Sequence, residues 1–461
     1  MFEKYHGTAA LLDLLAGWLP QQRWFPGRGT ALAELSLVSD VSLLAGDPAL
    51  RHLIVQTSLR GSAARFQVLI GARTDLPQAL TGALIGHVNG VAYYDALHDP
   101  ELADVLMRGI MEQRAGSALR FIREPTAAAF GGGELTGRVL GAEQSNTSLV
   151  FSELAILKVL RRLFPGANPD LEVADALARL GSARVAAPYG WIETDVDGEP
   201  VLLAVLSQYL AGATDGWTLA LAELASEHQA GSSHGQRHLA GSATVGADFA
   251  AEARLLGRAT AELHADMAAA FGSRDITRAE LTGLAAAMTS KLTEAIALVP
   301  ELRPHEARLC AAYDAVTQLA GPVSIQRIHG DYHLGQVLRS TQGWVALDFE
   351  GEPAVPLAQR RAPAPALRDV AGMLRSFDYA ARHQLIGRPA GGQVDALAAA
   401  WVQRCQAAFC AGYAAAGGTD PNDHSTLLRA LTLEKAVYEV VYEYRHRPSW
   451  LSIPLEFVAA A

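Results

Sequence analysis

The stretch from Ile328 to Arg339, IHGDYHLGQVLR, places two histidines, an aspartate and a glutamine among apolar residues. A second stretch, GWVALDFEGEP from Gly343 to Pro353, begins as an apolar run that ends abruptly at Asp348. Both patterns predict short strand-like pieces that stop at polar residues. Apolar strands that end in acids commonly present them to a functional site. These two stretches therefore predict a site built around carboxylates.

The two aspartates and the glutamine have the spacing expected for phosphoryl transfer. In such sites one aspartate takes or orients the proton of an attacking hydroxyl, while an amide oxygen and a second aspartate hold Mg²⁺ on the phosphates. We therefore predict Asp331 as the catalytic residue and Gln336 and Asp348 as ligands of Mg²⁺. Either aspartate alone is explained equally well by a turn at the end of a strand. The pair at this separation favours a kinase.

Composition places the chain among large globular proteins. It has 461 residues, of which 50% are hydrophobic and 19% charged, so it can bury two or three sizeable cores and is not a disordered chain. The formal net charge of -10 and the pI near 5.8 disfavour a nucleic-acid partner, which would require a basic face. The three cysteines lack CxxC spacing, which argues against a disulfide framework and a structural zinc site.

Hydropathy gives no sign of a membrane partner. The chain has no run of about 18 uncharged apolar residues, which a membrane-spanning helix would need. The N-terminal MFEKYHGTAALLDLL carries acidic residues within its apolar part, unlike a signal peptide. We therefore expect a soluble, cytoplasmic protein.

The periodicity of the chain changes from strands to helices. Residues 33–73 alternate apolar and polar side chains between turn-rich breaks, which predicts an antiparallel sheet after a short helix. Further strands are expected in TGRVLGAE, TSLVFS, LAILKVL and VLLAVLSQYL, and the second half has the pattern of long Ala- and Leu-rich helices. A Gly-, Ser- and His-rich stretch at 226–246 is predicted to be a loop, and we assign it no chemistry. The sequence thus predicts an α+β protein with domains at 1–90, 91–206 and 207–461.

A lysine on a predicted central strand supplies the cation that a nucleotide site needs. Lys158 lies among apolar residues in LAILKVL, where an unpaired ammonium is costly, so we expect a carboxylate partner. Glu172 near the start of the next helix, PDLEVADALARLG, is in the place of the helix glutamate of kinase N-lobes. The alternative, in which Lys158 extends to solvent, is weaker with such a partner available.

Two further segments are predicted to contact the nucleotide. In GAEQSNTSLVF, Ser145, Asn146 and Thr147 offer backbone N–H and hydroxyl groups to phosphate oxygens, although this loop contains a single glycine and would by itself be an ordinary hairpin turn. The segment LLAVLSQYLAGATDGW is expected to form the hinge after the last strand, where backbone groups near Gln208 and Tyr209 meet adenine.

The motifs HGDYHLGQ and LDFE resemble the H-G-D-x-H-x-x-N and [ILV]-D-[FW]-[DE] pair of the aminoglycoside-phosphotransferase-like kinases. This resemblance implies a bilobal, protein-kinase-like fold with a β-rich N-lobe and a helical C-lobe, binding ATP and Mg²⁺. It also implies that His329 and His333 brace the catalytic loop. Gln336 departs from the pattern, because the broad family has asparagine at this position and glutamine is one methylene longer.

Nearly end to end, the chain resembles the bacterial maltokinases. The similar segments are LPQQRWFPGRG, EQSNTSLVF, LKVLRRLFPGANPDLEV, LLGRATAELH, RIHGDYHLGQVLR, LDFEGEPAVPL, LRDVAGMLRSFDYAA and YEVVYEYRHRPSWLSIPL. The resemblance implies phosphorylation of the anomeric hydroxyl of maltose to give maltose 1-phosphate for α-glucan synthesis. It also implies an additional N-terminal α/β cap domain and a contact of this domain with trehalose synthase.

The acceptor site is predicted on a C-terminal helix. Between Leu433 and His446, spacings of three and four place Glu434, Tyr438, Tyr442 and Arg445 on one face, where aromatic rings beside charged groups suit a sugar. A packed helix surface with ion pairs explains the same face equally well. Asp369, in PALRDVAGML, is predicted either to order the catalytic loop or to touch the acceptor.

Two other functions stay open at the level of sequence. One is a related kinase for glucosamine or another small hydroxyl compound, since the fold by itself leaves the acceptor undetermined. The other is a non-catalytic, kinase-like scaffold, which Gln336 and the glycine-poor loop would fit. The charged residues retained in apolar segments argue against the scaffold, because they have no purpose without chemistry.

Overall fold

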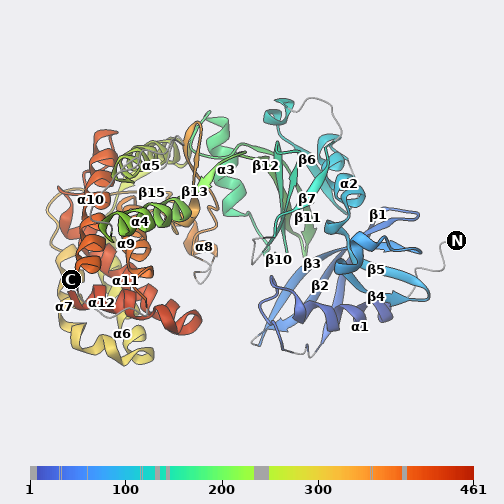
Figure 1. Ribbon diagram of the computed structural model, residues 1–461, viewed down its shortest axis with the longest axis horizontal. Coiled ribbons are helices and arrows are strands. Elements are labelled where there is room, and N and C mark those ends of the chain that lie inside the picture. The colour runs from blue at the N-terminus through green and yellow to red at the C-terminus, as the bar shows by residue number, and fades with distance from the viewer. Residues whose placement is uncertain are drawn as a thin grey trace. The chain divides into compact units, whose positions relative to one another are not determined.

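The computed structural model describes residues 8–30, 32, 34–59, 61–114, 116, 118–129, 135–141, 146–232, 249–352, 355, 357–386 and 392–460. Contacts divide the chain into two compact units. The N-terminal unit comprises Met1–Asp175 and Ala186–Ala211, and the helical unit comprises Ala176–Val185 and Gly212–Ala461. Both large sheets belong to the N-terminal unit, whereas most of the helices belong to the helical unit (Figure 1).

The first sheet of the N-terminal unit has the strand order β1-β2-β3-β5-β4, and a short later strand, β10, pairs with β3. The alternating pattern predicted for residues 33–73 forms its first three strands, whose paired neighbours are antiparallel. The elements of this part are α1 (Thr8–Trp18), η2 (Leu19–Gln21), β1 (Leu35–Leu44), β2 (Ala49–Leu59), β3 (Ser62–Arg73), η3 (Gln78–Ala83), β4 (Leu84–Val88), β5 (Val91–Asp95), η4 (Ala96–His98) and α2 (Pro100–Met111).

The second sheet has the order β6-β11-β12-β9-β8-β7 and carries the predicted nucleotide residues. Helix α3 begins at Pro169, where proline suits the first turn, and Gly181 follows its end with a positive φ of 73°. The elements are β6 (Arg120–Arg123), η5 (Pro125–Ala129), β7 (Gly137–Val139), β8 (Asn146–Phe151), β9 (Ala155–Leu160), β10 (Arg162–Leu163), α3 (Pro169–Arg179), β11 (Pro188–Val196) and β12 (Glu199–Gln208).

The two sheets of the N-terminal unit share one hydrophobic core. Leu50, Ile54 and Leu69 of the first sheet belong to the same buried cluster as Leu157 and Leu206 of the second. Because this core and the β3–β10 pairing cross the predicted boundary near residue 90, contacts alone do not separate residues 1–90 from 91–206. That boundary stays a prediction.

The helical unit contains nine further α-helices and two three-stranded sheets among the residues that the structure describes, with the orders β13-β16-β17 and β14-β15-β18. Its elements are β13 (Thr214–Asp215), α4 (Gly216–Ser232), α5 (Phe249–Phe271), β14 (Ser273–Asp275), α6 (Arg278–Leu298), η6 (Pro300–His305), α7 (Glu306–Val316), β15 (Ser324–Gln326), η7 (Leu334–Gln336), β16 (Val337–Ser340), β17 (Gly343–Ala346), α8 (Leu357–Arg360), β18 (Ala364–Pro365), α9 (Leu367–His383), α10 (Gln393–Ala415), α11 (Ser425–His446), η8 (Pro448–Trp450) and α12 (Ser452–Ala460).

One part of the predicted loop at 226–246 is helical. Helix α4 continues to Ser232, so residues 226–232 differ from the prediction, and residues 233–246 lie outside the described residues. The leucine- and alanine-rich sequence before this stretch favours a helix, and the helix continues past the first glycine of the stretch.

Within the described residues, no helix is both long and apolar enough to cross a membrane.

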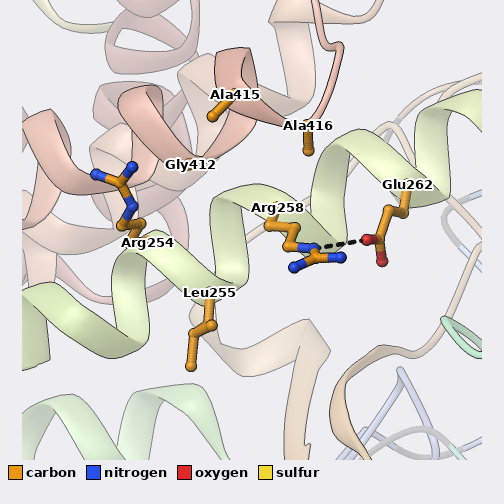
Figure 2. A pocket seen from close by; sticks show the side chains of 7 residues that line it. All are labelled: Arg254, Leu255, Arg258, Glu262, Gly412, Ala415 and Ala416. Carbon is orange, nitrogen blue, oxygen red and sulfur yellow. Dashed lines mark hydrogen bonds and ion pairs between the residues drawn. The ribbon is translucent and has the colours of Figure 1, made fainter.

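Helices α5 and α10 pack closely through glycine. A Cβ atom at Gly412 would lie 2.0 Å from the carbonyl oxygen of Arg254, which is far inside van der Waals contact. A surface hollow of about 490 Å³ lies beside this crossing. Figure 2 shows the side chains that line it. Its walls include Arg258 and Glu262, joined by a 2.8 Å hydrogen bond, but none of the described residues that we predicted for the site.

Candidate active site

The predicted catalytic loop follows β15, and Asp369 on α9 fixes it by hydrogen bonds. The carboxylate of Asp369 accepts hydrogen bonds from the backbone N–H groups of His329 (2.8 Å) and Gly330 (2.9 Å), and it contacts His264 Nε2 at 3.1 Å. Burial raises the pKa of Asp369, but the hydrogen bond from His264 and the other donors lower it more, so this pKa lies below its ordinary value. Asp369 is 1% exposed, so of its two predicted roles the geometry matches ordering the loop.

Two more contacts stiffen this loop. His329 Nε2 donates to the carbonyl oxygen of Leu347 (2.8 Å), and its Nδ1 accepts from the backbone N–H of Asp331 (3.3 Å), which assigns the ring proton to Nε2. A Cβ atom at Gly372 would lie 2.6 Å from the carbonyl oxygen of Tyr332, so glycine is needed for α9 to approach the loop this closely. The loop geometry is therefore imposed by its neighbours.

The β16–β17 hairpin brings Gln336 and Asp348 together. Val337 pairs with Ala346, and the backbone N–H of Leu347 donates to the carbonyl oxygen of Gln336 (2.9 Å), which places the two predicted metal ligands at one end of the hairpin. Gln336 Nε2 lies 3.4 Å from Asp348 Oδ2. Asp348 has a φ of 63°, a left-handed conformation that aspartate tolerates better than most residues.

These side chains fit the ligand preference of Mg²⁺. A carboxylate oxygen of Asp348 lies within 4.8 Å of one from Glu350, a residue that we did not predict. The amide of Gln336 adds an oxygen if its two terminal atoms are exchanged, which is a choice made from hydrogen bonding rather than from atom positions. Carboxylate and amide oxygens are the hard donors that Mg²⁺ selects.

Asp331 forms an ion pair that sequence analysis missed. Lys435 Nζ on α11 lies 3.1 Å from Asp331 Oδ1 and 2.7 Å from Glu352 Oε1. All three side chains are only partly exposed, between 18% and 22%. Burial raises the pKa of Asp331, but the nearby Lys435 cation outweighs it, so this pKa lies below its ordinary value. Asp331 is thus a carboxylate at neutral pH and is able to accept a proton.

Replacing Lys435 by methionine should move the acid limb of the activity profile to higher pH. Without the cation the pKa of Asp331 rises, so the carboxylate form is lost at a higher pH as the solution is acidified. The measurement is kcat/KM for the acceptor from about pH 5 to about pH 9. Lys435→Arg keeps the positive charge, so its acid limb should lie at the same pH as that of the wild type. If the acid limb of the methionine variant does not move, Lys435 does not lower the pKa of the catalytic base.

A cavity of about 440 Å³ opens beside Asp331 and Lys435 in the helical unit. Aromatic rings form much of its wall. Tyr438 and Tyr442 are stacked with ring centroids 6.3 Å apart, and Arg447 lies 4.2 Å above the ring of Trp450. The lining residues are Trp217, Asp331, His333, Gly335, Gly372, Ser376, Tyr379, Lys435, Tyr438, Glu439, Tyr442, Glu443, Arg447 and Trp450. Rings and charged groups together suit a polar ring compound.

The face of α11 that lines this cavity agrees with the predicted face at two of its four residues. Tyr438 and Tyr442 belong to it as predicted, but Glu434 and Arg445 do not. Glu434 is buried and paired with Lys291 (2.8 Å) and Arg368 (2.9 Å), while Arg445 is exposed. Residues missed by the prediction take their places, namely Lys435, Glu439 and Glu443. Their spacing of four residues places them on one face of the helix, and this was the sequence pattern that could have identified them.

Two carboxylates of the cavity wall are engaged by arginines. Glu443 pairs with Arg447 (2.6 Å), and Glu439 pairs with Arg375 (2.8 Å). Burial raises the pKa of Glu439 above its ordinary value despite this partner. The cavity wall therefore carries three carboxyl groups, those of Asp331, Glu439 and Glu443, against the cations of Lys435 and Arg447.

In the N-terminal unit, Lys158 has a carboxylate partner on α3. Its Nζ lies 3.3 Å from Asp170 Oδ2, a residue that we did not predict, and both side chains are about one-fifth exposed. Asn168 caps this helix, because its Oδ1 accepts from the backbone N–H groups of Asp170 and Leu171. Glu172, the predicted partner, lies in the same first turn.

The phosphate-loop residues are divided between two faces of the sheet. Ser145 lies outside the described residues, and Asn146 begins β8. Thr147 pairs with Val159, the neighbour of Lys158 on β9. Because side chains alternate along a strand, the side chain of Thr147 lies on the face of the sheet opposite to that of Lys158. On that face the Thr147 hydroxyl accepts a hydrogen bond from Arg161 Nε (2.8 Å). A phosphate contact by the Thr147 hydroxyl therefore does not agree with this geometry, although a backbone contact stays a prediction.

The two predicted hinge residues use their backbone N–H groups internally. Gln208 donates to the carbonyl oxygen of Ala187 (2.9 Å), and Tyr209 donates to that of Leu154 (3.0 Å). An adenine ring at this hinge would therefore not receive a hydrogen bond from either N–H group. Their role in nucleotide binding stays a prediction.

Residues 18–99 match the model of the maltokinase N-terminal cap domain. The glucosamine kinase of Streptacidiphilus jiangxiensis is 32% identical over 365 residues, which cover 76% of this chain and 79% of that protein. The glucosamine kinase of Mycolicibacterium smegmatis is 30% identical over 331 residues, covering 69% of this chain and 77% of that protein.

A solved structure, a glucosamine kinase in complex with glucosamine, ADP and inorganic phosphate, matches with a TM-score of 0.67 at 26% sequence identity. The match covers 97% of this chain and 98% of the other. It confirms the predicted α+β, kinase-like fold with an additional cap domain. The chain belongs to the glucosamine kinase family of sugar kinases and carries the maltokinase N-terminal cap domain.

Proposed function

We propose that this protein transfers the γ-phosphoryl group of ATP to a hydroxyl of glucosamine, with Asp331 as the general base. The observation that carries this proposal is the Lys435–Asp331 ion pair in the wall of the aromatic cavity. It keeps a carboxylate ionised where an acceptor hydroxyl would lie. A base with a lowered pKa is useful here because the transition state for phosphoryl transfer needs orientation of the hydroxyl more than strong proton abstraction.

Different residues of the helical unit serve as the base, hold the loop, position the sugar and bind the metal. Asp331 accepts the hydrogen bond of the attacking hydroxyl and then its proton, while Asp369 and His329 hold the loop that carries it. Tyr438, Tyr442 and the other aromatic side chains position the sugar ring. Gln336, Asp348 and Glu350 would hold Mg²⁺, which neutralises phosphate charge when bound. In the N-terminal unit, Lys158 would neutralise the α- and β-phosphates.

Charge supports glucosamine as the acceptor. Three carboxyl groups and two basic side chains line the cavity, and the amine of glucosamine is a cation at neutral pH that such a wall would attract. The two curated relatives and the solved structure quoted above are themselves named glucosamine kinases. The cap-domain match over residues 18–99 favours maltose as the second candidate, with maltose 1-phosphate as its product and trehalose synthase as a partner of the cap.

A coupled assay of ATP consumption with glucosamine, maltose, glucose and choline separates these proposals. Glucosamine should give the highest kcat/KM, with a phosphorylated sugar detected by ³¹P NMR. A preference for maltose by tenfold or more would replace the acceptor while leaving the base in place. Binding of ATP without turnover on any acceptor would instead support the kinase-like scaffold.

Replacing Lys158 by alanine should raise KM for ATP and lower kcat, by at least about tenfold in kcat/KM, because the phosphates lose a cation and Asp170 loses its partner. Steady-state kinetics over a range of ATP concentrations, with circular dichroism of the variant, provides the measurement. Arg303→Ala is the matched control, since Arg303 is exposed and does not line the aromatic cavity. Unchanged ATP kinetics in a folded Lys158 variant would place the nucleotide elsewhere.

A further inference from the structure

The N-terminal unit holds a cavity whose lining includes Asn146 and Thr147, two of the residues predicted to contact the nucleotide, and otherwise residues that the proposed reaction does not use. It has a volume of about 330 Å³ and lies where the segment after α1 meets η4 and strands β7, β8 and β9. We name it the Arg161 cavity. Its charged lining residues are Arg23, Arg28, Arg161, Asp95 and His98. Three arginines against one aspartate make its wall cationic.

Arg161 is a fixed, buried cation with spare hydrogen-bonding capacity. Its side chain is 1% exposed, its Nη2 pairs with Asp95, and its Nε donates to Thr147 Oγ1 (2.8 Å). The guanidinium carbon lies 4.9 Å from the ring centroid of Trp24, which is a cation–π contact. Its Nη1, however, has no hydrogen-bond partner among the residues that the structure describes. A buried guanidinium nitrogen without a partner is costly, so an anion that accepted a hydrogen bond from it would be bound favourably.

Arg23 and Arg28 provide the outer part of the same wall. Both are exposed, and neither forms an ion pair with any residue in the described part of the chain. The amides of Gln21 and Gln22 are held beside them by hydrogen bonds to the carbonyl oxygens of Gly17 (2.9 Å) and Trp18 (3.1 Å). The cavity thus has two exposed arginines in its outer wall and the buried Arg161 in its inner wall. The uncharged amides of the two glutamines lie beside the exposed arginines.

From this arrangement we infer that the Arg161 cavity binds a phosphate monoester of a small polar molecule. Guanidinium groups match phosphate oxygens in charge and geometry. The amides of Gln21, Gln22 and Asn146 suit hydroxyl groups on the rest of such a ligand. The volume of about 330 Å³ lies at the lower end of the range for small-molecule sites, which suits a single small ligand.

Occupancy of this cavity has a local consequence. Thr147, which is hydrogen-bonded to Arg161, is the second residue of β8. Arg161 directly follows β9. The beginning of β8 and the end of β9 therefore lie at the cavity wall. A ligand that binds Arg161 should slow amide hydrogen exchange in Asn146–Phe151. This consequence is independent of the acceptor and of catalysis.

Calorimetry with glucose 6-phosphate, inorganic phosphate and glucose tests the inference. The protein is first saturated with a non-hydrolysable ATP analogue and with glucosamine, so that the nucleotide site and the proposed acceptor site are filled. We expect glucose 6-phosphate to bind, glucose not to bind, and the double variant Arg23→Gln/Arg28→Gln to weaken binding by at least about tenfold. Arg108→Gln, which replaces a 61% exposed arginine of the same unit, is the matched control and should bind like the wild type.

Three results would overturn the inference: equal affinity of the double variant and the wild type, equal binding of glucose and its phosphate, or binding of inorganic phosphate only. Arg161→Lys provides a second test at the inner wall, because lysine keeps the charge but cannot offer the planar fork. Its binding should also weaken. A thermal unfolding curve and the exchange rates of Asn146–Phe151, with and without ligand, distinguish lost binding from lost folding.

Discussion

Replacing Asp331 by asparagine should lower kcat by about 10² or more while ATP and the sugar still bind. Asparagine keeps the size of the side chain and can accept a hydrogen bond, but it cannot take the proton of the acceptor hydroxyl. The fold should tolerate the change, because Lys435 keeps its 2.7 Å contact with Glu352. Calorimetry for the two ligands and a direct assay of the phosphorylated sugar provide the measurements.

The same substitution at an exposed site controls for this experiment. Asp314 lies on α7, its side chain is exposed and does not line the cavity, so Asp314→Asn should keep wild-type kinetics. If the Asp331 variant still forms product at a near wild-type rate, Asp331 is not the base and the reading of the HGDYHLGQ motif fails.

The second large effect is expected for Asp348→Asn. Loss of one carboxylate from the predicted metal site should reduce Mg²⁺-dependent turnover by at least about 10², since a metal ion supplies several kcal/mol of transition-state stabilisation. Asparagine also tolerates the left-handed φ of 63° at this position, so the backbone need not change. Turnover measured across a series of Mg²⁺ concentrations tests this, together with calorimetry of Mg²⁺ binding in the presence of ADP.

Asp275→Asn is the matched control for the metal experiment. Asp275 is exposed on β14 and belongs to the same unit, so its loss should change neither Mg²⁺ affinity nor turnover. Wild-type Mg²⁺ dependence in a folded Asp348 variant would show that another residue carries the metal.

Sequence by itself determined the parts of the site that are encoded locally. Asp331 and Gln336 lie on one loop directly before β16, and Asp348 follows β17, so the pairing of these two strands in a hairpin was enough to bring Gln336 and Asp348 together. Strand alternation also contained information that the prediction did not use. Alternation alone places Thr147 on the opposite face from Asn146 and Ser148. The observed register, in which Ser148 pairs with Lys158, then shows that Lys158 lies on the face away from Thr147.

Only the tertiary structure decided which groups complete the site. Lys435 is 104 residues away from Asp331, and no local pattern links them. On α11 the buried residues include Glu434, Glu439 and Glu443, so apolar periodicity does not define one buried face, and neighbouring residues differ by about 100° in direction. Whether Glu434 or Lys435 lines the cavity depends on how α11 packs against α6 and α9. That packing is the sum of many contacts distant in sequence, which periodicity cannot report.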